Sequence, residues 1–70
     1  MYTTQAQAPL GMTIPDYHVM AAEYHEDAAE LHRNAAAHHE YGNYQASNEQ
    51  AQLAKKSGQL AIQNCDMAMK

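Results

Sequence analysis

A chain of 70 residues forms one domain at most, and a chain this short usually needs a disulfide, a metal or a partner chain to hold its fold. Eight acidic residues outnumber four basic ones, for a net charge of −4, which argues against binding to nucleic acid. The single cysteine excludes an intrachain disulfide, and no apolar run approaches the about 20 residues that span a bilayer. We therefore expect a cytoplasmic protein, without membrane contact, that relies on a metal or on oligomerisation.

Residues 1–12 contain Gln, Thr, Pro9 and Gly11 and have no apolar periodicity, which is typical of a disordered tail. They also lack the basic and apolar regions of a signal peptide. We expect residues 1–12 to form a disordered tail and residues 13–70 to form the folded part.

The first helix is expected to begin after Thr13. Thr13 and Asp16 have the spacing of a capping box, and Pro15 suits the first helical turn. No further Gly or Pro follows until Gly42, which predicts a helix over about 14–41.

The sequence predicts a tight turn at residues 42–43. Gly42 suits the residue after a helix end, and Asn43 is a good N-cap for a second helix over about 44–69. Because a short connection forces neighbouring helices to run antiparallel, we expect an all-α hairpin.

Small and apolar residues alternate in steps of four and three along both expected helices, which is the heptad pattern of a coiled coil. The two rows, called the seam below, are Tyr17, Ala21, Tyr24, Ala28, Leu31, Ala35 and His38, and then Ser47, Ala51, Ala54, Gly58, Ala61, Cys65 and Ala68. The second row consists almost wholly of small residues, so we expect close backbone approach around Gly58.

A further apolar row lies beside the seam of the second helix: Leu53, Leu60 and Met67, called the leucine stripe below. One partner helix cannot cover both rows, so we expect two hairpins to dimerise into a four-helix bundle. The expected interface residues are Tyr17, Tyr24, Leu31, Leu53, Gly58 and Leu60. The first helix is acidic and the second mildly basic, which favours their pairing, and the alternative is that these charges form solvated faces.

Four of the five histidines recur every seven residues, as His18, His25, His32 and His39, and His38 is the fifth. Helical residues seven apart are separated by about 10.5 Å along the axis, whereas zinc needs nitrogens about 2 Å away. No two residues of this row can therefore share a metal ion within one helix. Three interpretations stay open: rings at an interface edge, binding of Zn, Ni or Cu by all five histidines across two or more chains, and a pH switch.

Pairing the two helices brings a second group to the open end of the hairpin. It comprises His18, Met20, Cys65, Met67 and Met69, a donor set that suits a soft ion such as Cu(I). The alternative is that the methionines fill apolar space and that Cys65 is an inert small side chain.

The stretch AAEYHEDAAELHRNAAAHHEYGNYQA resembles a group of short His/Ala-rich bacterial proteins, with a similarity that covers about residues 16–62. The resemblance implies a helical hairpin of unknown function and supplies no catalytic residues. The second helix here lacks the histidines that this group often carries there.

The sequence therefore predicts a non-enzymatic helical module, structural or protein-binding, that acts as a homodimer without a cofactor. The alternative is a metal-binding or metal-buffering protein that uses the histidines of the first helix across a subunit interface.

Overall fold

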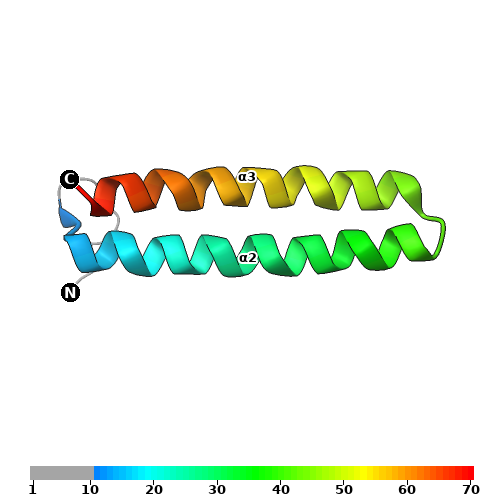
Figure 1. Cartoon of the computed structure of the whole chain (residues 1–70), viewed down its shortest axis with the longest axis horizontal. Helices are drawn as coiled ribbons and strands as arrows, with labels where there is room; N and C mark the ends of the chain where they lie inside the picture. Colours follow the sequence, from blue (N-terminus) through cyan, green and yellow to red (C-terminus); the bar gives the residue numbers. More distant parts are fainter. Residues whose placement is uncertain (1–10) are drawn as a thin grey trace.

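A computed structural model describes residues 11–70, and most of the expected tail lies outside these residues. Helix α2 spans Ile14–Glu40 and helix α3 spans Tyr44–Ala68. The two helices run antiparallel, side by side along their whole length (Figure 1). The expected all-helical hairpin is confirmed, whereas its dimerisation stays a prediction.

Helix α2 begins with the capping box that the sequence predicts. The Asp16 amide donates to Thr13 Oγ1 at 3.3 Å, and the Thr13 amide donates to Asp16 Oδ2 at 3.0 Å. These two bonds satisfy donors that lack a partner inside the helix, and the Asp16 carboxylate also complements the positive helix end. The start of α2 is therefore fixed by local chemistry.

The turn is a Schellman motif centred on Gly42. The Asn43 amide donates to the His38 carbonyl at 2.8 Å, and the Gly42 amide donates to the His39 carbonyl at 3.1 Å. Gly42 has a φ of 83°, a left-handed conformation that glycine adopts without steric cost. Asn43 occupies the N-cap position of α3, but its side chain makes no capping hydrogen bond.

The seam lies between the helices as the heptad pattern predicts. All of its residues are buried or half-buried, and the fully covered ones are small: Ala21, Ala35, Ser47, Ala54, Ala61 and Ala68. No large side chain among residues 11–70 is fully buried. The core is therefore a thin layer of methyl groups, flanked by half-buried Tyr17, Tyr24 and Leu31.

Gly58 does not have the close backbone contact that its position in the small-residue row suggests. A Cβ atom placed on Gly58 would meet no heavy atom within 4 Å. Ala28, which lies on the opposing row, is also small. The α2 backbone nevertheless does not come close enough to Gly58 to contact it. The expectation of close approach at Gly58 is wrong for the single hairpin.

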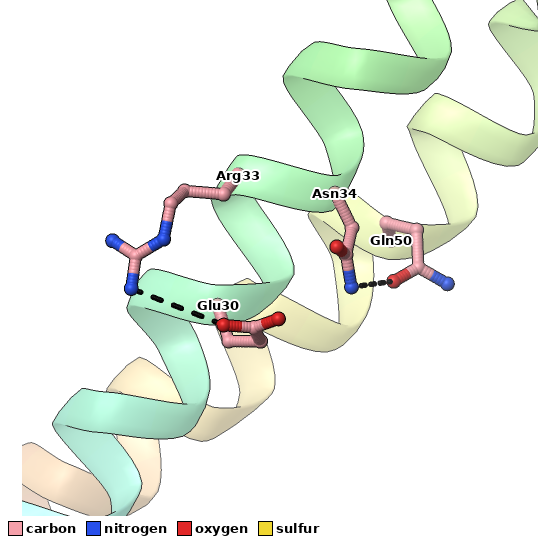
Figure 2. Close-up of polar contacts among 4 residues, drawn as sticks. All are labelled: Glu30, Arg33, Asn34 and Gln50. Atoms are coloured by element: carbon pink, nitrogen blue, oxygen red, sulfur yellow. Dashed lines mark hydrogen bonds and ion pairs between the residues drawn. The ribbon is translucent and has the colours of Figure 1, made fainter.

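Two polar contacts join the helices. The buried Ser47 hydroxyl donates to the Ala35 carbonyl at 2.8 Å, and Asn34 Nδ2 donates to Gln50 Oε1 at 3.4 Å on the surface. Figure 2 shows Asn34 reaching from α2 to Gln50 on α3, while Arg33 pairs with Glu30 on its own helix.

Of the two interpretations of the charges, pairing between the helices and solvated faces, the described residues fit the second. Within residues 11–70 the ion pair is Glu30 with Arg33 at 3.9 Å, inside α2 and largely exposed, where such a pair adds little stability. The acidic and basic residues extend into solvent instead of meeting across the seam.

Candidate functional site

The hydrogen bond from Asn34 to Gln50 marks one side of the hairpin, since it bridges the two helices beside the seam. His32 precedes Asn34 by two residues, which places the two about 160° apart around α2. The histidine row therefore lies on the opposite side of the hairpin from this bond.

All four residues of the histidine row are exposed on α2. The His39 ring packs against Tyr44, the first residue of α3, with ring centroids 4.8 Å apart and an interplanar angle of 56°. His38 differs from the row because it lies half-buried on the seam. Sequence spacing identified the row but not the contact with Tyr44, which forms across the turn.

Three alanines alternate with these histidines on the same side of α2. Ala22, Ala29 and Ala36 each lie three residues before one histidine of the row and four after another, so the seven residues form a continuous strip, called the histidine face below. No carboxylate, Lys or Arg interrupts this strip, although α2 carries six acidic residues. The strip is thus an uncharged surface, when its imidazoles are neutral, on an otherwise acidic helix.

The leucine stripe lies on the other side of the hairpin. Leu53 follows Gln50 by three residues, so the two are neighbours on the surface of α3. Leu53 is 49% exposed, Met67 is 38% exposed and Leu60 is half-buried. Since the histidine face and the leucine stripe lie on opposite sides, one flat contact between two hairpins cannot cover both.

The expected interface residues fall into two groups. Four of them, Tyr17, Tyr24, Leu31 and Gly58, are half-buried on the seam between α2 and α3. Leu53 and Leu60 are the two that lie outside the seam and remain accessible to a second chain.

Residues 11–70 contain no group of three or more His, Cys, Asp or Glu side chains placed to hold a metal ion. The histidine row is too widely spaced along α2 for chelation within one chain. A metal site built from these histidines requires nitrogens from another molecule, so its existence stays a prediction.

The residues expected at the open end do not share one side of the hairpin. Met67 and Met69 are two residues apart, and thus point to nearly opposite sides of the helix end. Cys65 and Met20 are half-buried, whereas Met69 is 71% exposed. One hairpin therefore does not bring all these sulfur atoms to a single ion.

An open depression at the turn is lined by Gly42, Asn43, Tyr44, Gln45, Ala46 and Glu49. Its carboxylate, Glu49 Oε2, accepts a hydrogen bond from Gln45 Nε2 at 3.4 Å. The lining offers no nucleophile paired with a base, the arrangement that covalent catalysis requires.

Sequence reasoning missed the two polar links between the helices. Ser47 was one polar residue in a row of small ones, and a hydroxyl buried in such a row needs an acceptor. That requirement was the available signal for its bond to the Ala35 carbonyl. Asn34 and Gln50 carried no signal, because exposed amides are common on helices.

Comparison with protein-family models, with curated proteins and with solved structures finds no match to this chain. Neither of the two described helices is apolar enough over a sufficient length to cross a membrane.

Proposed function

We propose that the protein is a small non-enzymatic helical module that acts as a homo-oligomer, with a structural or protein-binding role. The observation that carries this proposal is the contrast between its core and its surface. The buried residues of the described hairpin are alanines and one serine, while larger apolar side chains such as Leu53, Val19 and Ile62 are at least 49% exposed.

This contrast favours association because apolar burial is the main force that holds a fold together. An alanine methyl group contributes the least of all apolar side chains, at about 0.8 kcal/mol per buried carbon. The single hairpin leaves Leu53, Val19 and Ile62 largely in water, and a second copy would cover part of this apolar surface.

Native mass spectrometry of the full untagged chain, together with sedimentation equilibrium, tests the proposal. We expect a dimer or a higher even-numbered oligomer whose thermal midpoint rises with protein concentration. A chain that stays monomeric over the whole concentration range, with a midpoint independent of concentration, would refute it.

Metal binding across a subunit interface is a second candidate function. It is favoured by the exposure of all four residues of the histidine row, of which His39 alone packs against another ring. Neutral imidazole is a good ligand for Zn(II), Ni(II) and Cu(II).

A metal-dependent module should show a higher thermal midpoint with Zn(II) than with EDTA, because a ligand that binds the folded state stabilises it. The double variant His25→Ala, His32→Ala should lose this increase. If the midpoint and the oligomeric state are the same in EDTA and in Zn(II), Ni(II) or Cu(II), this candidate fails and the structural proposal stands.

A further inference from the structure

We propose that two copies of the chain pair through the histidine face of α2, antiparallel, about a two-fold axis close to Ala29. This inference rests on the homo-oligomer proposed above and names the surface that forms it. Its basis is the position of the charges on the two sides of the hairpin, together with the symmetric spacing of the histidine face.

On the side of the hairpin that carries the leucine stripe, α2 is a poor surface for a two-fold contact. Helix α2 brings Glu23, Asp27 and Glu30 to this side, because they lie three or four residues from one another and from Asn34. A two-fold axis that stacks α2 on its copy there would place these carboxylates against their own copies. Like charges that face each other across an interface oppose association.

The seven residues of the histidine face include no carboxylate. Glu26 and Glu40 border this face as neighbours of Ala29 and Ala36. Helix α3 adds Ile62 and Lys55 to this side, since each follows a residue of the leucine stripe by two positions. Asp66 follows Ile62 by four residues and is its neighbour there. Ile62 is 58% exposed in the single hairpin. Its burial in a dimer would add apolar area beside the uncharged strip of α2.

The spacing of the histidine face makes it complementary to itself. With the axis at Ala29, His25 lies opposite the partner's His32, and His18 lies opposite the partner's His39. In the same register Ala22 lies opposite the partner's Ala36, and Ala29 meets its own copy. Layers of small residues thus alternate with layers of paired rings along the contact.

Each kind of layer has a physical role. Alanines allow two helix axes to approach to about 8 Å, at the short end of the usual range. A neutral imidazole has one donor and one acceptor nitrogen, so two facing rings can be joined by one N–H···N hydrogen bond. An antiparallel register shifted by one helical turn would place each ring against an alanine and lose the hydrogen bond between the rings.

A charge placed on each side of α2 distinguishes the two surfaces. Ala29→Glu lies on the histidine face, and the matched control Ala37→Glu lies on the other side, three residues after Asn34. In sedimentation equilibrium of the full chain we expect Ala29→Glu to abolish the dimer, and Ala37→Glu and Leu53→Glu to retain it, with helical circular dichroism preserved in all three.

The outcomes separate this inference from the proposed function. If the parent chain is an oligomer that Leu53→Glu or Ala37→Glu dissociates while Ala29→Glu does not, the homo-oligomer stands and the histidine face is not its surface. If the parent chain is a monomer, both proposals fail.

Cysteine cross-linking tests the register without adding a charge. In a Cys65→Ala background, Ala29→Cys should form a disulfide-linked dimer under mild oxidation, because a disulfide needs Cα atoms about 4.4–6.8 Å apart. Ala22→Cys and Ala36→Cys should cross-link with each other when mixed, but neither with itself. Self-linked Ala22→Cys dimers would show a parallel pair, and absence of the Ala29→Cys dimer would overturn the proposed axis.

Discussion

Replacement of Gly58 by alanine should stabilise the protein. Glycine in a helix interior costs about 0.8–1.0 kcal/mol relative to alanine, since its backbone loses more freedom on folding. The added methyl group would meet no atom within 4 Å, so no clash offsets this gain in the single hairpin. The position is half-buried, so partial burial of the methyl adds a fraction of the about 0.8 kcal/mol that full burial gives.

We therefore expect Gly58→Ala to raise the free energy of unfolding by about 1 kcal/mol. In a domain of this size, that increase moves the thermal midpoint up by about 4–8 °C. Thermal and urea melts followed by circular dichroism measure the change. The variant and the parent should be compared at one protein concentration, because association also shifts the midpoint.

Gly42→Ala is a matched control for this experiment. A Cβ on Gly42 also meets nothing within 4 Å, but the φ of this residue is +83°. Alanine pays about 1–2 kcal/mol in a left-handed conformation, so the same substitution should destabilise the protein at this position. The two variants differ in the backbone conformation of the glycine and not in the available space.

A lower midpoint for Gly58→Ala would refute this reasoning. Such a result would mean that a second chain, absent from the single hairpin, approaches the α3 backbone at Gly58. The loss should then disappear at concentrations low enough to dissociate the oligomer. A loss that persists in the monomer would show that α2 and α3 pack more closely than the described structure has them.

Three further substitutions test the parts of the hairpin that hold the two helices. Thr13→Ala removes the cap of α2 and should lower the free energy of unfolding by about 1 kcal/mol, which Thr13→Ser should not do, as measured in urea melts. Ser47→Ala deletes the buried bond to the Ala35 carbonyl and should cost about 0.5 kcal/mol, because the loss of about 1 kcal/mol is partly offset by the better helix propensity of alanine. Ala61→Leu forces a large side chain into a site that is 0% exposed and should lower the stability by about 1–3 kcal/mol, whereas Ala37→Leu on the exposed surface should change it by less than about 0.5 kcal/mol.

The sequence was sufficient for the seam because heptad spacing is a direct consequence of helix geometry. The rows that begin at Tyr17 and Ser47 are the covered rows of the structure. Gly42 could be identified for a similar reason, since few residues other than glycine adopt the conformation that ends a helix in this way. In both cases a local rule fixes the structure without reference to the partner helix.

The spacing between the helices could not be predicted in the same way. Small residues permit close approach, but they do not enforce it, and the open space at Gly58 shows the difference. The opposite charges of the two helices were compatible with pairing or with solvated faces, and exposed side chains are well solvated and gain little from pairing. Asn43 occupies the N-cap position, but its side chain forms no bond to the helix.

The relation between the histidine face and the leucine stripe required the pairing of the two helices. The histidine face lies beside the seam on α2, and the leucine stripe lies beside it on α3. The periodicity within one helix does not determine on which side of the hairpin its row lies. The bond from Asn34 to Gln50 identifies the flank, and it separates the two rows. An interface that joins Leu53 and Leu60 with the histidines is therefore not available to one flat contact.

A seam of alanines specifies the register of the two helices only weakly, because it has few large side chains that fit into matching gaps. The links that fix the register are the Schellman turn at Gly42, the Ser47 bond to Ala35 and the bond from Asn34 to Gln50. All of them lie in the half of the described hairpin near the turn.

The open end should therefore separate more readily than the turn end. Amide hydrogen exchange of the full chain should be faster in α2 before Tyr24 and in α3 after Ala61 than in the segments near the turn, because local opening costs less where fewer links must break. Residues 28–38 of α2 serve as the internal reference in the same experiment. Equal protection along both helices, or greater protection at the open end, would contradict this account and would mean that contacts outside the single hairpin hold the open end together.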